Sequence, residues 1–311
     1  MIKIKHFVAI VKKPADKDEI LSALDYFKPD RVTLFIFKDS LRIESEDVKK
    51  WFLSRLLTLE VLLLDTKALT RNSFILTLDK LDAFQAIAIP IGNHRAFYKS
   101  VPLLKKKGIK IIHVSDGVID AFSLFGFCMS VKWKNFKSLF KLVVMYFEFL
   151  QGKADYCFFQ LYPLPACLAK HTLPLTSKTA GVLPKSIMKL ILEKKVATLL
   201  LPGWGEDEAD LQKTFNLKSN YCATTKSKHI IINGQQLSLD TFITAEDVIH
   251  LGIIDRIYAT ASTAVYYAKL VNPDIYCKVL LNGYLNRQYG QYYEYFFRKK
   301  GQELGIEFTH K

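Results

Sequence analysis

The chain has 311 residues, of which 50% are hydrophobic and 24% are charged, a balance typical of folded globular domains and unlike that of disordered or fibrous chains. Because one hydrophobic core rarely spans this length, two domains are expected. The 44 Lys and Arg residues against 30 Asp and Glu give a net charge of +14, which favours polyanionic partners such as nucleic acid, anionic lipid or phosphorylated small molecules.

Short apolar runs alternate with helical patterns through the first half of the chain. Strands that are buried on both faces and separated by helices pair in parallel, with right-handed crossovers. The pattern therefore predicts a doubly wound, Rossmann-like domain over residues 1–175. The predicted strands are 7–11, 31–37, 59–64, 86–91 and 109–114, and the predicted helices are 17–26, 48–57, 78–84 and 96–107.

The segment 136–150 is the most apolar helical candidate, and lysines surround it. Such a helix can lie on an anionic membrane, or it can be a buried core helix whose lysines extend to solvent; the core helix is the simpler interpretation. Beyond it, Pro163, Pro165 and Pro174 are expected to break regular structure. We place the domain boundary directly after them.

Residues 176–311 repeat the alternation and predict a second Rossmann-like domain. The fold class expected is thus α/β, with two such domains facing each other across a cleft. This is the GT-B arrangement of sugar-nucleotide glycosyltransferases, shared by some epimerases and periplasmic binding proteins. The predicted strands are 197–201, 228–232, 256–260 and 276–281, and the predicted helices are 186–193, 208–215, 245–251, 263–270 and 288–304.

The cysteines and the apolar runs bear on the compartment. Five cysteines are present, an odd number, and none forms a Cys-x-x-Cys pair, which disfavours a disulfide framework or a zinc cluster and indicates a reducing compartment. No apolar run approaches the ~20 residues that span a bilayer, and no secretory pattern opens the sequence. A cytoplasmic protein is expected, with peripheral contact at the inner membrane face left open.

A carboxylate follows the predicted strand 109–114. Ligands of parallel sheets collect at the carboxyl ends of the strands, and Asp116 falls just beyond this one. Gly117 lets the backbone turn and leaves the carboxylate unobstructed. Asp116 there can take a proton from an acceptor hydroxyl; the alternative is an ordinary turn-forming Asp-Gly pair.

Two glycines, Gly203 and Gly205, follow the predicted strand 197–201. They expose backbone N–H groups, but the acids that open the next helix argue against a phosphate resting directly on them. Without a Gly-Lys-Ser/Thr sequence the loop is not a P-loop. We expect the two glycines to shape the donor side of the cleft.

A second group of polar residues lies around the predicted strand 256–260. Ser262 and Thr263 follow it and open a helix, where hydroxyls and unpaired N–H groups can bind an anion. Glu246 opens the helix before that strand, and a carboxylate there can accept both ribose hydroxyls of a nucleotide. Simple helix capping and an ordinary acidic first turn are the alternatives.

These stretches resemble the bacterial GT-B sialyltransferases of the lipooligosaccharide and capsule polysialyltransferase families. The resemblance rests on KGIKIIHVSDG, ITAEDVIHL, ATASTA and the linker-like KADYCFFQLYPLP. It implies that Asp116 is the catalytic base, that Glu246 binds ribose, and that the Ser-Thr pair at 262 and 263 contacts the donor phosphate. The chain departs from the pattern at Ser115, where the family has an acid, and it has no His-Pro dipeptide. His229 is the nearest substitute for that histidine, or else a core strand residue.

The resemblance implies an inverting, metal-independent transfer of sialic acid from CMP-sialic acid to a cell-surface glycan or glycolipid. No cofactor beyond the CMP-sugar substrate, no metal and no nucleic acid is expected, while an anionic membrane surface is a possible partner. The one Asp-x-Asp, Asp16-Lys17-Asp18, is interpreted as an exposed acidic turn. The alternatives are a transferase for another nucleotide sugar, such as CMP-Kdo or a UDP-sugar, and a non-catalytic two-domain binding protein at the membrane.

Overall fold

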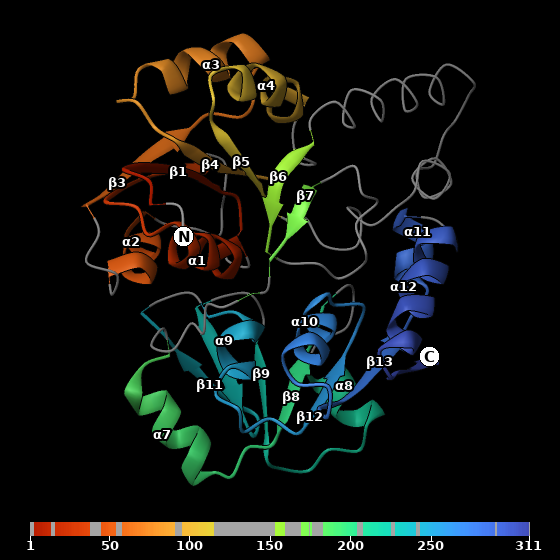
Figure 1. Ribbon diagram of the computed structural model, residues 1–311. Coiled ribbons are helices and arrows are strands. Elements are labelled where there is room, and N and C mark those ends of the chain that lie inside the picture. The colour runs from red at the N-terminus through yellow and green to blue at the C-terminus, as the bar shows by residue number, and fades with distance from the viewer. Residues whose placement is uncertain are drawn as a thin grey trace. The chain divides into compact units, whose positions relative to one another are not determined.

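The computed structural model describes residues 3–13, 16–37, 45–53, 58–90, 95–114, 153–158, 169–173, 175, 183–203, 208–224, 228–240, 243–289 and 291–310. These residues fall into two compact units, one up to Lys178 and the other from Thr179 onward. Each unit is a β-sheet with helices packed against it, coloured red to green in the first unit and green to blue in the second (Figure 1). The fold is thus α/β in both halves.

The sheet of the first unit, called sheet A here, has seven strands in the order β3-β2-β1-β4-β5-β6-β7. Every neighbouring pair in it is parallel. The central strands are continuous apolar runs buried on both faces, as parallel strands under two helix layers must be. The strands are β1 His6–Val11, β2 Arg31–Phe37, β3 Thr58–Leu64, β4 Ala86–Ile89, β5 Lys110–His113, β6 Ala154–Cys157 and β7 Ala169–Thr172.

Two pairs of helices cover sheet A. In Figure 1, α3 and α4 lie on one face, and α1 and α2 lie on the other. Phe74 of α3 and Phe97 of α4 pack edge to face, with ring centroids 5.1 Å apart, in the core on their side of the sheet. The helices are α1 Asp16–Phe27, α2 Ser45–Leu53, α3 Arg71–Asp79 and α4 Arg95–Lys106.

The third helix differs from its predicted range of 78–84. It begins at Arg71, because the Thr70 side chain accepts a hydrogen bond from Ser73 N–H and Ser73 returns one, forming a capping box. Its buried side chains are Phe74 and Leu78, one turn apart. The apolar residues beyond Asp79, such as Leu81, pack on the same core from the connection that follows the helix.

Strands β6 and β7 were not predicted, since their region was expected to lack regular structure. Each has four residues, and β7 is mostly exposed, so neither carries an apolar pattern of its own. They form by extending the parallel ladder from β5. The predicted helix 136–150 and the prolines at 163, 165 and 174 lie outside the described residues.

The sheet of the second unit, sheet B, has the order β11-β10-β9-β8-β12-β13-β14. The five strands β9, β8, β12, β13 and β14 pair in parallel. Strand β10 pairs antiparallel with β9, and β11 pairs antiparallel with β10. Asn233 and Gly234 join β10 to β11 with φ of 50° and 83°, as a tight hairpin turn of type I′ requires. The strands are β8 Thr198–Leu201, β9 Tyr221–Thr224, β10 His229–Ile232, β11 Gln235–Ser238, β12 Arg256–Ala259, β13 Tyr276–Leu281 and β14 Ile306–His310.

Helices cover both faces of sheet B. Leu211 of α8 packs with Leu200 and Leu280 on one face. On the other face the Cys277 thiol points at the backbone of α10, and α9 packs against α10. The helices are α7 Lys185–Glu193, α8 Glu208–Thr214, α9 Ala245–Ile249, α10 Ala264–Val271, α11 Tyr284–Tyr289 and α12 Gln291–Glu303; the single helix predicted over 288–304 is thus replaced by α11 and α12.

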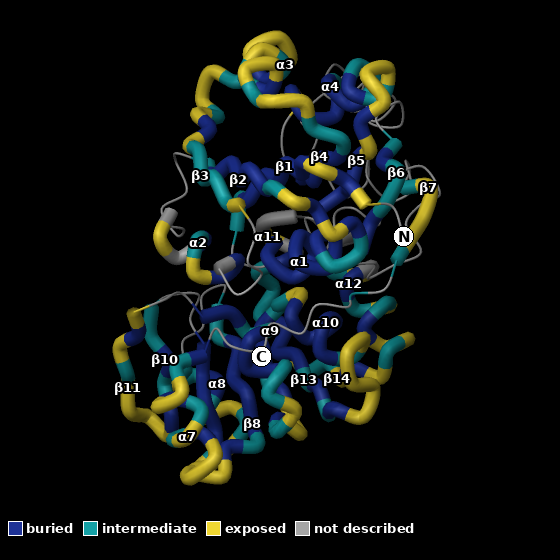
Figure 2. Tube along the Cα trace, turned by 60° about the vertical axis from the view of Figure 1, so that its left-hand side comes forward, coloured by how far each residue is buried: buried dark blue, intermediate teal, exposed yellow. Residues whose placement is uncertain are grey.

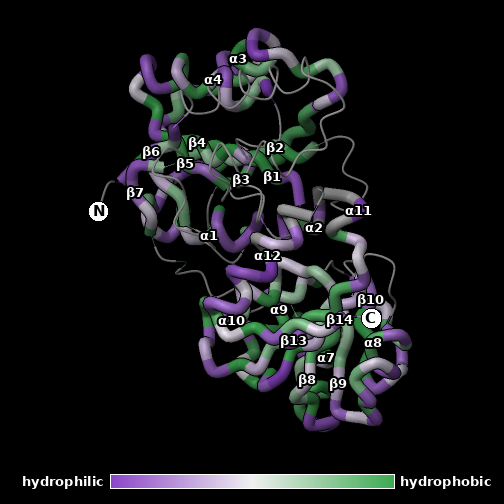
Figure 3. The backbone as a smooth tube through the Cα atoms, turned by 90° about the vertical axis from the view of Figure 1, so that its right-hand side faces the viewer, coloured by the Kyte–Doolittle hydropathy of each residue, from purple (hydrophilic) through white to green (hydrophobic). Residues whose placement is uncertain are grey.

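Burial and hydropathy follow this layering. The central strands are buried, whereas β11 and α7 are largely exposed (Figure 2). Apolar residues concentrate in the sheets, and hydrophilic ones lie along the outer helices and turns (Figure 3). No helix within the described ranges is both long and apolar enough to cross a membrane.

Gly301 of α12 tests the packing of the second unit. A Cβ built there would overlap the ring of Phe308 on β14, at 2.7 Å from Cε2. We therefore expect Gly301→Ala to lower the free energy of unfolding by about 1–2 kcal/mol, because overpacking outweighs the ~1 kcal/mol gain in helix propensity. Urea denaturation of this variant and of Gln302→Ala, an exposed neighbour, measures the difference. Equal stability of the two variants would contradict the tight contact.

Candidate active site

The strand order of sheet B reverses between β8 and β12. From β8 the chain continues to β9 on one side, and it later returns to add β12 on the other side. Ligands of open α/β sheets bind outside the carboxyl ends of the strands at such a switch point. The residues that follow β8 and β12 are therefore the first candidates for a site in this unit.

The backbone holds these two strand ends side by side. Leu201 is in register with Ala259, and Thr260 N–H extends the ladder by donating to the Leu201 carbonyl at 3.2 Å. Gly203 and Thr260 are then close neighbours, since a Cβ on the glycine would lie 3.6 Å from Thr260 Oγ1. Thr260 is 1% exposed, and its hydroxyl has no hydrogen-bond partner in the part of the chain that the structure describes.

Helix α10 starts directly after this point. Ser262 Oγ accepts a hydrogen bond from Ala264 N–H at 3.3 Å, while Thr263 occupies the N-cap position. Accepting this bond leaves the Ser262 O–H hydrogen available as a donor. Thr263 is exposed and forms no side-chain cap bond. The first three N–H groups of α10 already have partners in the two residues before it, so an anion here would rest on the positive helix end and the hydroxyls.

Helix α9 brings Glu246 to the same edge of sheet B. A short connection joins α9 to the start of β12, where Asp255 N–H donates to the Ala197 carbonyl before β8. The amino end of α9 therefore points toward the carboxyl edge of the sheet. Glu246 is the second residue of α9 and is half-buried.

A buried capping box fixes the start of α9. Asp247 Oδ2 accepts from Thr244 N–H at 2.9 Å and from the Thr244 hydroxyl at 3.0 Å, and Asp247 N–H donates back to that hydroxyl at 3.3 Å. The contact of α9 with α10 includes a hydrogen bond between the His250 ring and the Tyr267 hydroxyl. Glu246, Ser262, Thr263 and Gly203 are thus brought to one edge of one sheet.

His229 is not brought into this group. His229 is the first residue of β10, and the next residue, Ile230, pairs with Thr224 at the carboxyl end of β9. It therefore lies at the carboxyl edge, but two strands away from β8, or about 10 Å at the usual strand spacing. Its Nδ1 lies 3.4 Å from Ser238 Oγ on β11. Ser262 and Thr263 lie a further strand away, beyond β12.

Two predicted site residues, Asp116 and Gly205, lie outside the described residues. The strand before Asp116 is described, however. It is β5, parallel to β4 and β6, and it ends at the fully buried His113. Val114 N–H then donates to the Ile89 carbonyl at 3.0 Å, so the ladder continues to within two residues of Asp116.

At the carboxyl edge of sheet A, charged residues that were predicted to be exposed are buried. Asp16 and Asp18, expected in an exposed turn, are 1% and 3% exposed at the start of α1. Asp16 Oδ2 accepts from Lys12 N–H and Lys13 N–H at 2.8 and 3.0 Å, so the carboxylate orders the β1–α1 turn. The buried Lys17 lies over the ring of Trp51, with Nζ 5.5 Å from the centroid. A run of charges gives no sequence signal for such burial, because tertiary packing produces it.

Two of the described cysteines have thiols that are hard to ionise. Cys222 and Cys277 are buried free thiols, and burial raises the pKa of each to about 12. They remain neutral thiols at physiological pH and are unsuited to nucleophilic catalysis. Within the described ranges no three His, Cys, Asp or Glu side chains converge in a way that could hold a metal ion.

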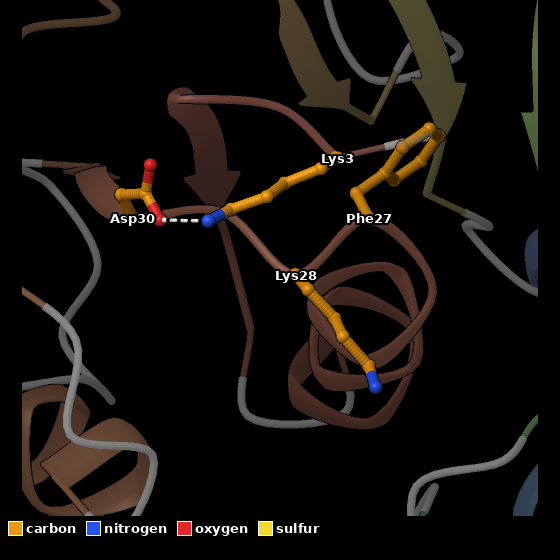
Figure 4. A pocket seen from close by; sticks show the side chains of 4 residues that line it. All are labelled: Lys3, Phe27, Lys28 and Asp30. Atoms are coloured by element: carbon orange, nitrogen blue, oxygen red, sulfur yellow. Dashed lines mark ion pairs between the residues drawn. The ribbon is translucent and has the colours of Figure 1, made fainter. Parts of the chain in front are cut away.

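A hollow of about 380 Å³ lies elsewhere, lined by Lys3, Phe27, Lys28 and Asp30. Lys3 and Asp30 precede β1 and β2, so it sits at the amino edge of sheet A, opposite the edge where ligands of parallel sheets bind. Lys3 pairs with Asp30 at 3.2 Å, and both side chains are mostly exposed; Lys28 points away from the pair (Figure 4). A solvated ion pair of this kind does not define a functional site.

Comparison with known proteins supports the architecture. No protein-family model matches the chain, and no curated protein matches its sequence. A solved structure of UDP-N-acetylglucosamine 2-epimerase matches with a TM-score of 0.51 at 12% identity, covering 100% of this chain and 84% of that one. The structure of LpCGTa in complex with UDP matches with a TM-score of 0.51 at 8% identity, covering 99% and 86%. The chain therefore has the GT-B fold of two Rossmann-like units, which confirms the predicted fold class.

We expect the buried capping box of α9 to contribute measurably to the free energy of unfolding. Thr244→Ala removes both contacts of the Thr244 hydroxyl and leaves the buried Asp247 carboxylate short of a donor, so we expect a loss of about 1–2 kcal/mol in unfolding free energy. Urea denaturation measures it. Thr70→Ala, which breaks the exposed capping box of α3, is the matched control and should cost less. A smaller loss for Thr244→Ala than for the control would show that the box does not hold α9.

Proposed function

We propose that this chain is a glycosyltransferase that uses a nucleotide sugar and binds the donor nucleotide at the carboxyl edge of sheet B. One observation carries the proposal. Glu246 at the start of α9 and Ser262 and Thr263 at the start of α10 reach the same edge, on either side of β12, at the switch point of the sheet. The similar structures, one of an epimerase named for a UDP-sugar and one holding UDP, add support.

The two helix starts offer complementary chemistry to a nucleotide. The Glu246 carboxylate can accept hydrogen bonds from the ribose hydroxyls, which are charge-assisted and strong. The hydroxyls of Ser262 and Thr263 can donate to the phosphate, whose negative charge grows as the sugar leaves, and the positive end of α10 attracts it. We leave His229 outside this donor site, because two strands separate it from β8.

For the donor we propose CMP-sialic acid, on the resemblance of the chain to bacterial sialyltransferases. In that reaction Asp116 takes the proton of the acceptor hydroxyl, the hydroxyl oxygen attacks the anomeric carbon from the face opposite CMP, and CMP leaves with the bonding electron pair. The configuration is inverted, and no metal is needed. The acceptor would be a cell-surface glycan of lipooligosaccharide or capsule, and a chain of net charge +14 suits an acceptor on an anionic membrane surface.

A UDP-sugar is the second candidate for the donor. It is favoured by the UDP in the LpCGTa structure, whose fold this chain shares along 99% of its length. Both donors place a ribose and a phosphate at the same edge of the sheet. They differ in the base and in the number of phosphates, so direct binding measurements separate them.

Nucleotide binding tests the proposal. Calorimetric titration with CMP, UDP and AMP should show a pyrimidine nucleotide binding best, CMP for the first candidate and UDP for the second. Glu246→Gln should weaken that nucleotide by roughly one to two orders of magnitude, since bonds to a charged group contribute about 1.5–3 kcal/mol. Its 2′,3′-dideoxy analogue should be affected little.

The matched control is Glu193→Gln, at an exposed acid of α7, which should change no affinity. Parallel losses for the nucleotide and its dideoxy analogue would remove Glu246 from the ribose. No binding of any nucleotide would leave a non-catalytic binding protein as the better interpretation.

The proposed base has its own test. Asp116→Asn keeps the shape of the side chain but cannot accept a proton, so transfer from CMP-sialic acid should fall by at least about 10²-fold while CMP affinity stays the same. Ser115→Ala, one residue earlier, should transfer at close to the wild-type rate. Wild-type transfer by a folded Asp116→Asn protein would exclude Asp116 as the base.

A further inference from the structure

The Thr260 hydroxyl is a buried polar group to which the proposed function assigns no role. It lies one residue past β12, at the switch point of sheet B, in a residue that is 1% exposed. It has no hydrogen-bond partner among the described residues, although leaving a buried hydroxyl unpaired is unfavourable. Such a group needs an explanation in a native fold, and a ligand that supplies the missing partner is one.

The surroundings of this hydroxyl indicate where the partner would be. A Cβ atom built on Gly203 would lie 3.6 Å from Thr260 Oγ1. Apart from the sequence neighbours of Gly203, no other heavy atom of the described residues would lie within 4 Å of that Cβ atom. The hydroxyl therefore borders a space that any side chain at 203 would occupy. Gly203 has no positive φ, so the backbone does not demand glycine here, and glycine leaves the position in front of the hydroxyl without a side chain.

The start of α10, which has no acid in its first turn, favours an anion in that space. Thr260 is two residues from Ser262, whose hydroxyl accepts from the first N–H of α10, and the eight-residue α10 directs its positive end to the same edge. Thr263 leaves its own hydroxyl unused by the helix cap. A phosphate oxygen can accept from the Thr260 hydroxyl and from these groups together.

We propose that Thr260 is a phosphate-binding residue and that Gly203 provides a side-chain-free position that lets the phosphate reach it, a proposal that rests on the nucleotide site of the preceding section. The Thr260 hydroxyl donates to a phosphate oxygen of the donor. Because the hydroxyl is unpaired in the free protein, its desolvation is already complete before the ligand arrives, and the bond formed on binding adds to affinity.

Two variants test this from opposite sides of the space. Thr260→Val keeps the shape and removes the donor, and Gly203→Ala keeps the donor and fills the space in front of it at ordinary contact distance. Each should weaken CMP or UDP, whichever the wild type binds, by about tenfold or more, the effect of losing one such bond. Neither should change the affinity for cytidine or uridine, which carry no phosphate. Thr260→Ser should retain nucleotide affinity close to that of the wild type.

Stability distinguishes this role from a structural one. Removing an unpaired hydroxyl should leave the melting temperature of Thr260→Val unchanged or higher. A lower melting temperature with unchanged nucleotide affinity would mean that the protein itself uses the hydroxyl, and it would overturn the inference. If the wild type binds nucleotide and both variants bind it equally well, the inference fails and the proposed function stands. If the wild type binds none of these nucleotides, both fail.

Discussion

The parallel pairing of β8 with β12 is the constraint on which the candidate site depends. Leu201 and Ala259 are in register, and the Thr260 N–H bond to Leu201 extends the pairing past both strands. The chain therefore leaves the two strands side by side, one into Gly203 and the other into Ser262. Strand β8 is buried throughout, and β12 buries Ile257 and Ala259, so a shift of register by one residue would turn core side chains to the wrong face. Packing of the core thus fixes the positions of the polar residues beyond it.

The central strands could be predicted from sequence because burial on both faces leaves a continuous apolar run. HFVAIV of β1 and TLLL of β8 are such runs. The short strands could not, since AKHT of β7 and QQLS of β11 are mostly exposed and become strands only by hydrogen bonding to a neighbour. The shift of α3 has another cause, because a capping box at Thr70 outweighs the apolar spacing that continues to Leu81.

Within the candidate site, sequence order predicted which residues reach the edge of the sheet but not how far apart they lie. Glu246 and Ser262 flank one strand, so their proximity follows from a single helix–strand–helix unit. The distance of His229 from this group could be predicted only with the strand order, in which β9 separates β10 from β8. Thr260 could not be singled out, because an unpaired buried hydroxyl is visible only once its surroundings are known. Asp16 and Asp18 are the converse, charges whose burial no local pattern signals.

The two helix starts at this edge differ in charge, and the difference assigns an orientation to the nucleotide that we propose to bind there. Helix α9 begins with Glu246 and Asp247, so its positive end is already matched by the protein's own carboxylates. Helix α10 begins with Ser262 and Thr263 and has no acid in its first turn, so its positive end is open to an anion from outside. A ligand that fits both must present hydroxyl donors to α9 and negative charge to α10. A nucleotide does so when its ribose lies at Glu246 and its phosphate lies beyond β12, which directs the phosphate toward Thr260 and the departing sugar out from the edge of the sheet.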